Sequence, residues 1–556
     1  FGETLVPSKP FEPDGEQRIA GYFGTEEQPA LNSMLGFPLY FTLRQVLSES
    51  QPAAQLAYRL DKHMAQNPDP NVIPTFIDNH DTARFLSTGG QDAFEQALAL
   101  IFTSPGLPFI YQGTEQMLPE TRQSMFEGGW LAKPNTFDPQ SDAYQLIRNL
   151  AALRAGNAVF MRGDLEVLTG ETTGPGLLVY KRTLGDDSAL ILMNTADHAI
   201  LVHALDAGLA PGQVSKRILF GGDDVIADGT GHLNLTLPTR AVWVLQPGDG
   251  VVAVEPAPKS SVQFEQRPGD AILTSDFELA GTIDQPGVEL QLIINGNLDN
   301  ARTFTADDSG HWQITLPVRD LGETRSAVQI YAPATNSLSE RIEYRTRVSE
   351  PEIEVSVVDD PDDAYGPTGS YIPPQHSESG RQREMESASI RAAGRNLELV
   401  LTMAEVTDVW VPNNGYDNLA VTVFVSFPGS QGARALPFIN AQMPDGLTWD
   451  LAHVGSGWMS YAYSAEGAGP HEQGRKLGVA PRVSADKASR TIRMFYEGAK
   501  LGVDDWSGAT LYITTWDFTG EGSYLELRPE PAEWFFGGAS EDSPKIMDDL
   551  LIKIGD

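Results

Sequence analysis

The first 157 residues alternate between two apolar patterns. Apolar residues recur at the three- and four-residue spacing of amphipathic helices over residues 40–47, 53–65, 92–102 and 143–154. Between these segments, residues 73–77 and 107–111 form short runs of β-forming and apolar residues, as buried strands do. This alternation of strands with helices predicts an α/β structure for the N-terminal part of the chain.

Beyond residue 158 the pattern changes to short strands separated by Gly, Asp and Pro. Strands are predicted at residues 165–168, 176–182, 189–194, 241–245, 277–283, 288–295, 310–316, 397–403, 420–426 and 510–516. Residues 247–259, rich in Pro and Gly, are typical of a linker. We therefore predict β domains over residues 158–247, 248–350 and 351–556, after an α/β domain over residues 1–157.

Composition excludes several classes of function. The formal net charge of -36 and the pI near 4.5 would repel nucleic acid phosphates, whereas a neutral polysaccharide is not disfavoured. Cysteine is absent, which excludes disulfides and thiolate chemistry. The sequence also lacks a His-Glu-x-x-His zinc motif, a Gly-rich phosphate loop and a run of about 18 apolar residues. We expect no organic cofactor, no nucleic acid partner and no membrane span.

Candidate chemistry lies directly after the first predicted strand, where Asp78, Asn79, His80 and Asp81 follow one another. Polar residues at the carboxyl ends of strands form the active sites of α/β barrels. A structural interpretation competes with this one, because Asp81 stands just before residues 82–84 and could cap the next helix. The residues alone leave both interpretations open.

Two of these stretches, taken together, resemble the α-amylase superfamily, glycoside hydrolase family 13. The sequence FIDNHD at residues 76–81 is similar to the fourth sequence region of that family. The sequence GLPFIYQGTEQ at residues 106–116 is similar to its eighth barrel strand and the loop that follows. Their order and spacing also match the family.

Three further stretches support the resemblance: FGET at residues 1–4, LNSMLGFPLYF at residues 31–41 and LIRNLAALRAGN at residues 146–157. They resemble the third region, the segment after it and the helix that closes the barrel. One departure is Gly36, where the family often has Asp, so the role of that Asp is unfilled. The resemblance implies a multidomain chain, in which the C-terminal half of a (β/α)8 TIM barrel is followed by three β-sandwich domains.

The resemblance also implies roles for individual residues. Glu3 would be the general acid/base, kept protonated near neutral pH by burial and neighbouring carboxylates. Asp81 would stabilise positive charge on the sugar, and His80 would donate to a sugar hydroxyl. The nucleophilic Asp of the family follows an Arg two residues earlier at a strand end, and no such pattern ends a predicted strand here. Because the chain opens abruptly at Phe1, we expect that Asp to lie upstream, in a longer protein.

Other polar and aromatic residues have competing interpretations. Arg84 is a candidate for substrate binding, although pairing with a carboxylate at the barrel rim is favoured. Tyr111 is a second substrate-binding candidate, with strand packing as the alternative. Glu115 is expected to fix its loop through an ion pair rather than to act as a second acid. Trp130 either stacks on a sugar or fills a core.

The two C-terminal domains resemble modules of secreted enzymes. The turn at residues 307–312 is similar to bacterial immunoglobulin-like repeats, and we expect Trp312 to be core. Residues 359–373 and 413–418 resemble the C-terminal module of glucodextranases, which is associated with carbohydrate binding or surface attachment. Of the six Trp in this last domain, we expect one or two to face solvent. The acidic run 359–363 is a candidate for structural Ca²⁺, and an unliganded turn is the competing interpretation.

These observations favour a secreted retaining α-glucan hydrolase of the α-amylase type that cleaves α-1,4 bonds of starch-like polymers. A related glucanotransferase or neopullulanase-type enzyme shares the same motifs. If the fragment exists alone, it would be a non-catalytic glucan-binding or surface-attachment protein, because half a barrel lacks the nucleophile. We expect an extracellular or periplasmic location, with a cell-surface polymer as a second partner. Product length, oligomeric state and calcium sites stay open.

Overall fold

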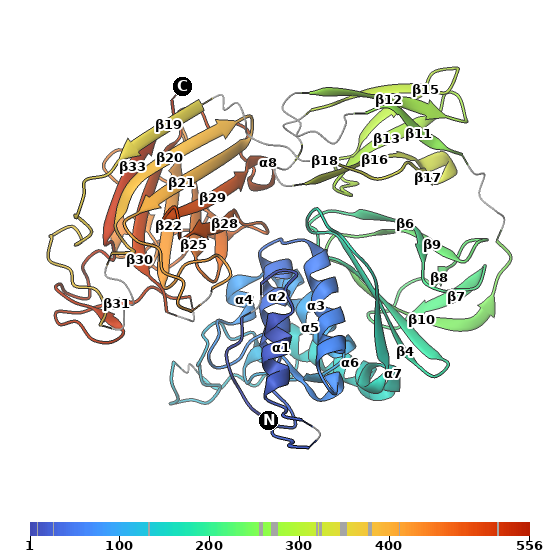
Figure 1. Ribbon diagram of the computed structural model, residues 1–556, viewed down its shortest axis with the longest axis horizontal. Coiled ribbons are helices and arrows are strands. Elements are labelled where there is room, and N and C mark those ends of the chain that lie inside the picture. The colour runs from blue at the N-terminus through green and yellow to red at the C-terminus, as the bar shows by residue number, and fades with distance from the viewer. Residues whose placement is uncertain are drawn as a thin grey trace. The chain divides into compact units, whose positions relative to one another are not determined.

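The computed structural model describes residues 1–7, 9–25, 27–131, 134–254, 260–267, 276–317, 321, 325–344, 353–375, 381–410, 412–519 and 522–555 (Figure 1). The chain forms two compact units. The first comprises Phe1–His80 and Arg84–Arg347, and the second comprises Val348–Asp556 with Asp81–Ala83. None of the helices in the described ranges is long and apolar enough to cross a membrane.

Helices dominate the N-terminal part of the first unit, drawn in blue and cyan (Figure 1). They are α1 (Asp14–Gly21), α2 (Phe37–Ser48), α3 (Ala53–Gln66), α4 (Phe85–Thr88), α5 (Gln91–Thr103), α6 (Asp142–Gly156) and α7 (Ala158–Arg162), with the 3₁₀ turns η1 (Pro70–Val72) and η2 (Thr114–Gln116). All four predicted helices are present. Helix α2 begins earlier than predicted because Pro38 is favourable in a first turn. Helix α1 was not predicted.

Four short parallel segments lie between these helices. Gly2 pairs with Met34 in a parallel bridge, Gly36 N donates to Pro74 O at 2.9 Å, and β1 (Pro74–Thr75) pairs in parallel with β2 (Leu107–Pro108). This is the order of successive strands in a parallel barrel. The described residues contain this portion of a parallel sheet and no closed barrel.

The two predicted barrel strands are much shorter than expected. Residues 73–77 and 107–111 were predicted to be strands, but each pairs regularly over only two residues. The two segments are joined by Leu107 N donating to Ile73 O at 2.8 Å and Phe109 N donating to Thr75 O at 2.7 Å. The residues that follow in each segment continue as loops.

The rest of the first unit consists of two β domains. In the first, β3 (Asp164–Gly170), β4 (Leu177–Leu184), β5 (Asp187–Asn194), β10 (Val242–Val251), β7 (Gln213–Arg217) and β8 (Val225–Ile226) form one sheet, beside the pair β6 (Ile200–Asp206) and β9 (His232–Leu237). Leu178, Tyr180 and Ile191 from this sheet share one apolar core with residues of α3 and α5. The sheet thus covers the helices of the barrel segment.

The predicted linker at residues 247–259 is wrong in its first part. Strand β10 continues to Val251, pairing with β7 through a register shift between Pro247 and Val251. Proline is tolerated there because the ladder is irregular at that point. Residues 255–259 of the predicted linker lie outside the described residues.

The second β domain matches the predicted sandwich. One sheet contains β11 (Val262–Gln266), β12 (Phe277–Ile283) and β15 (His311–Leu316); the other contains β14 (Arg302–Thr305), β13 (Glu289–Ile294), β16 (Ser326–Ala332), β17 (Ser337–Leu338) and β18 (Ile342–Tyr344). Trp312 is 3% exposed, and its ring centroid lies 5.3 Å from that of Phe264 and 6.0 Å from that of Phe304. The prediction that Trp312 is core is confirmed.

The second unit is a larger antiparallel sandwich, drawn in yellow to red (Figure 1). One sheet is ordered β19 (Ile353–Val358), β20 (Met385–Ala393), β21 (Asn396–Met403), β29 (Thr491–Glu497) and β28 (Arg482–Asp486). The other is ordered β27 (Arg475–Lys476), β26 (Ser460–Ser464), β25 (Leu451–Ser456), β22 (Leu419–Ser426), β30 (Thr510–Asp517) and β33 (Asp548–Lys553). Small pairs β23 (Ala435–Leu436) with β24 (Ala441–Gln442) and β31 (Glu526–Leu527) with β32 (Phe535–Phe536), and the helix α8 (Gly498–Leu501), complete the unit.

Tryptophans are divided between core and surface as predicted. Trp449, Trp506 and Trp516 are almost fully buried, whereas Trp410 and Trp534 are each about half exposed. The sandwich core is therefore built around large aromatic side chains, and two indole rings are about half exposed to solvent.

A buried ion pair lies inside this sandwich. Arg383 and Asp517 are both fully buried and face each other, with Arg383 Nε donating to Asp517 Oδ1 at 2.8 Å. The Arg383 guanidinium also lies 5.4 Å from the ring centroid of Phe536. Because both charges have left water, each depends on the other.

Replacing Arg383 by Met should destabilise the second unit by about 3–5 kcal/mol, because the Asp517 carboxylate would stay buried without its partner. Urea unfolding followed by tryptophan fluorescence measures this loss. The matched control is Arg475→Met, which breaks an exposed pair with Glu466 and should cost about 1 kcal/mol or less. Equal losses in the two variants would contradict a special role for the buried pair.

Candidate active site

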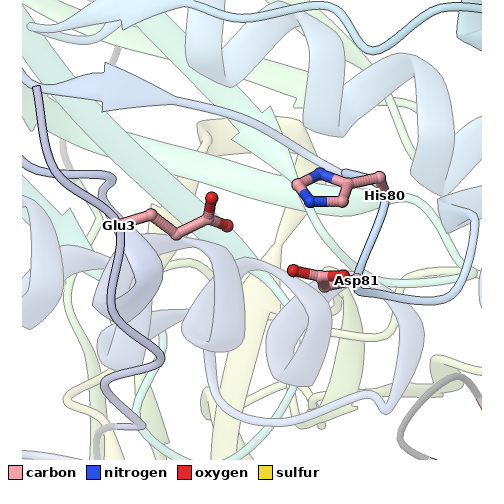
Figure 2. Close-up of side chains that lie close together, drawn as sticks. All are labelled: Glu3, His80 and Asp81. Carbon is pink, nitrogen blue, oxygen red and sulfur yellow. The ribbon is translucent and has the colours of Figure 1, made fainter.

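Three of the predicted site residues come together. One side-chain ligand atom from each of Glu3, His80 and Asp81 lies within 4.8 Å of the other two. Glu3 follows the bridge between Gly2 and Met34, and the other two lie in the loop after β1. Figure 2 shows the Glu3 carboxylate directed from its own chain segment toward the imidazole and carboxylate of the other loop. These residues therefore converge at the carboxyl ends of the parallel segments.

The expected burial of Glu3 is wrong for this structure. Its side chain is exposed, as are those of His80 and Asp81. Asn79 Nδ2 donates to Glu3 Oε1 at 3.4 Å, which is a long hydrogen bond. Glu3 lies on an irregular segment outside any helix or named strand, and the described residues around it leave its carboxylate open to water.

Asp78 is the buried carboxylate of this loop. Its Oδ2 accepts from Phe85 N at 3.1 Å, at the start of α4, and its Oδ1 accepts from Thr114 Oγ1 at 2.8 Å. Burial raises the pKa of Asp78, and the nearby Arg84 guanidinium opposes that shift. The carboxylate that satisfies the first amide of α4 is therefore that of Asp78, although sequence reasoning had considered Asp81 for the capping role. The position of Asp78 directly after the apolar strand could have indicated this capping role.

Arg84 connects the loops that follow β1 and β2. It is 1% exposed, and its guanidinium donates to Gln112 O at 2.7 Å, Thr114 Oγ1 at 3.1 Å and Glu120 O at 3.2 Å. It also lies 3.9 Å from Asp78 Oδ1, which confirms the predicted pairing with a carboxylate. Substrate binding by Arg84 stays a prediction. Because its guanidinium is buried and bonded to this loop, Arg84 positions the loop.

Tyr111 and Glu115 lie in the same loop. The ring of Tyr111 is stacked 4.3 Å from the Arg84 guanidinium and 6.4 Å from the ring of His80, so it connects the buried arginine with the exposed site. Glu115 Oε2 accepts from Gly113 N at 2.9 Å. It fixes the loop, as predicted, but through a backbone hydrogen bond.

Trp130 lies on a folded loop beside the site. It is 70% exposed, so the alternative that it fills a core is wrong. The loop is held by hydrogen bonds from Ser124 N to Trp130 O at 2.9 Å and from Thr136 N to Met125 O at 3.0 Å. At its base Arg122 Nε donates to His80 O at 2.9 Å. The loop therefore presents an indole ring to solvent from a segment tied to the site.

Among the described residues, two groups of acidic or imidazole side chains are close enough to hold a metal ion. One is Glu3 with His80 and Asp81, and the other is Asp359 with Asp363 and Asp548 in the second unit. The second group includes the acidic run from which calcium binding was predicted, together with a residue far along the chain that had not been considered.

Two parts of the chain match models of known protein families. Residues 15–154 match the α-amylase catalytic domain, and residues 355–554 match the SLH-like C-terminal binding module of glucodextranase. Residues 15–154 therefore resemble the catalytic domain of the α-amylase family. His80, Asp81, Arg84 and Tyr111 lie inside the matched residues, whereas Glu3 lies before them. The resemblances proposed from the sequence are confirmed at both ends, and the roles of the individual site residues stay predictions.

Curated proteins similar to the chain include a glucanotransferase and an α-amylase. The chain is 34% identical over 186 residues to a cyclomaltodextrin glucanotransferase of Paenibacillus macerans, which covers 31% of this chain and 24% of that protein. It is 28% identical over 237 residues to an α-amylase of Niallia circulans, which covers 38% of this chain and 42% of that protein. The chain thus spans less than half the length of either relative.

Solved structures with similar segments include a three-domain cyclomaltodextrin glucanotransferase, CldA. That structure is 27% identical, has a TM-score of 0.37 and covers 46% of this chain and 50% of its own. An α-amylase from Geobacillus thermoleovorans in complex with acarbose is 22% identical and has a TM-score of 0.36. The similar segment covers 44% of this chain and 52% of that amylase.

Replacing Arg84 by Ala should destabilise the first unit by about 3–5 kcal/mol, since Asp78 and three acceptors in the neighbouring loop lose a buried donor. Hydrogen exchange should accelerate most at residues 112–120. The control is Arg148→Ala on the exposed face of α6, which should change stability by about 0.5 kcal/mol or less. Unchanged exchange at residues 112–120 would show that Arg84 does not hold this loop.

Proposed function

We propose that this chain is part of a secreted, retaining α-glucan hydrolase of the α-amylase type that cleaves α-1,4-glucosidic bonds of starch-like polymers. One observation carries the proposal: Glu3, His80 and Asp81 converge within 4.8 Å at the carboxyl ends of parallel segments, next to a stretch that matches the α-amylase catalytic domain. Polar groups at that end of a parallel barrel are where such folds perform chemistry.

In the proposed reaction Glu3 protonates the departing glycosidic oxygen, and after departure of that sugar it deprotonates the water that hydrolyses the glycosyl-enzyme. Asp81 stabilises the oxocarbenium-like transition state with its negative charge, and His80 donates a hydrogen bond to a hydroxyl of the same sugar. A retaining enzyme also needs a carboxylate about 5 Å from the acid to attack the anomeric carbon. We propose that a segment outside these 556 residues supplies it.

Transfer is the alternative to hydrolysis. The curated relatives include both cyclomaltodextrin glucanotransferases and an α-amylase, so the superfamily match supports an α-glucan-active enzyme without separating the two reactions. Both reactions pass through the same glycosyl-enzyme and differ in whether water or a sugar hydroxyl accepts the glycosyl group. Cyclic or lengthened products would favour the transferase, and reducing ends formed without them would favour the hydrolase.

We propose an extracellular or cell-surface location, supported by the match of the second unit to an SLH-like binding module. The half-exposed Trp410 and Trp534 are the candidates for stacking on a cell-surface polymer or on glucan. If the chain acts alone, this unit would make it a glucan-binding or surface-attachment protein.

Intact mass of the purified protein, measured beside a reducing-sugar assay on soluble starch, tests the proposal. Activity together with a larger mass or a tightly held second chain is expected. In that preparation Asp81→Asn and Glu3→Gln should each lower kcat by about 10²–10⁴-fold, because a charge-stabilising group or a proton donor is lost. The control Glu127→Gln, an exposed carboxylate outside the cluster, should keep kcat within about twofold. An Asp81→Asn enzyme within tenfold of the parent would refute the role of Asp81.

Trp130→Ala should raise KM for long maltooligosaccharides about tenfold, because the exposed ring would lose its stacking on a glucose unit. Turnover of a short aryl maltoside should stay unchanged if the ring acts at a distal subsite. The control is Leu131→Ala, which removes a neighbouring exposed apolar side chain that has no ring. A similar rise in KM for both variants would mean that general apolar contact, rather than stacking, binds the sugar.

A further inference from the structure

Carboxylates from the two ends of the second unit meet at one place. Asp359 and Asp363 lie in the loop that follows β19, and Asp548 is the first residue of β33. One carboxylate oxygen from each lies within 4.8 Å of the other two. Strand β19 is the edge strand of one sheet of the sandwich and β33 the edge strand of the other. The three groups therefore gather where the edges of the two sheets meet.

The loop between residues 359 and 366 is folded into a defined shape. Both carboxylate oxygens of Glu384 accept backbone amides of the loop, from Asp362 N at 2.5 Å and from Ala364 N at 3.1 Å. Gly366 N then donates to Met547 O at 2.9 Å, one residue before Asp548. The loop thus returns to the last strand, which places its two carboxylates against Asp548.

The cluster contains one buried, one half-buried and one exposed carboxylate. Asp548 is only 4% exposed, and its Oδ2 accepts from Met385 N at 2.6 Å. Asp359 Oδ2 is fully buried and has no hydrogen-bond partner among the described residues. None of the ion pairs within the described ranges involves Asp359, Asp363 or Asp548. Keeping the buried Asp548 carboxylate charged without a cation is unfavourable.

We propose that Asp359, Asp363 and Asp548 bind a Ca²⁺ ion that joins the first loop of the second unit to its last strand. The donors are all oxygens, which calcium prefers, and their separations suit an ion that takes oxygens at about 2.3–2.6 Å. The set contains no His or Cys, so it does not favour zinc or copper. The unpartnered Asp359 oxygen is the atom that such an ion would satisfy.

Calorimetric unfolding of the whole chain tests the site. After dialysis against a chelator, Ca²⁺ at about 100 times its Kd should raise the Tm of the second unit by about 5–10 °C. Isothermal titration should show binding at this site with a much smaller response to Mg²⁺. An absent shift, or an equal response to Mg²⁺, would overturn the assignment to calcium.

Substitutions of the ligands, compared in the chelated protein and in the presence of Ca²⁺, give a sharper test. Asp548→Asn should leave the chelated protein as stable as the parent or more stable, because the buried amide keeps an oxygen for Met385 N and cannot carry a charge, while abolishing the calcium-dependent rise in Tm. Asp363→Asn, at an exposed ligand, should keep the fold and weaken Ca²⁺ binding at least tenfold. An Asp548→Asn protein that is destabilised with and without calcium, or an Asp363→Asn protein with unchanged affinity, would overturn the proposal.

Two controls locate the ion. Asp542→Asn changes an exposed carboxylate near β33 and should keep the full calcium response. Asp81→Asn changes the other cluster of potential ligands and should also keep it. Loss of the response in Asp81→Asn alone would place the ion in the candidate active site and refute the site proposed here.

Discussion

The geometry of the candidate active site depends on one buried guanidinium. Arg84 is enclosed by protein and bonded to two carbonyl groups, a hydroxyl and a carboxylate that belong to the loops after β1 and β2. A cation buried this deeply is tolerated only when its donors are satisfied, so each of those loops is held where the arginine needs it. The exposed side chains above it, His80 and Asp81, take their positions from this interior arrangement. The buried Arg84 therefore helps to fix the loop that carries His80 and Asp81.

Much of the fold could be predicted because its local signals agree with its packing. Apolar spacing located α2, α3, α5 and α6, and alternation located the strands of the β domains. Helix α1 was missed because it is mostly polar: Ile19 is buried, but Glu16 is also buried, in an ion pair with Arg59 far along the chain. The barrel strands were predicted too long because an apolar run does not show how many of its residues pair with a neighbouring strand.

The site was predicted in part for a similar reason. Glu3, His80 and Asp81 could be found from motif order, but their exposure could not, because it depends on which segments cover the loop. Asp78 and Arg84 lie in the motif, yet their structural roles require knowing that the loop at residues 112–120 lies next to them. In the second unit, the acidic run at residues 359–363 was visible, whereas Asp548 was not. Only the fold brings that residue to the run.

The second unit is also closed on itself. The hydrogen bond from Gly366 N to Met547 O ties its opening loop to the start of its last strand, and β33 covers the edge of β30. Most domains tolerate trimming at a terminus, because few contacts depend on the last residues. Here removal of the final strand by an exopeptidase or an early stop codon would uncover β30 as a new edge and release the opening loop as well. Loss of β33 would thus disturb both the opening loop and the sheet edge of this unit.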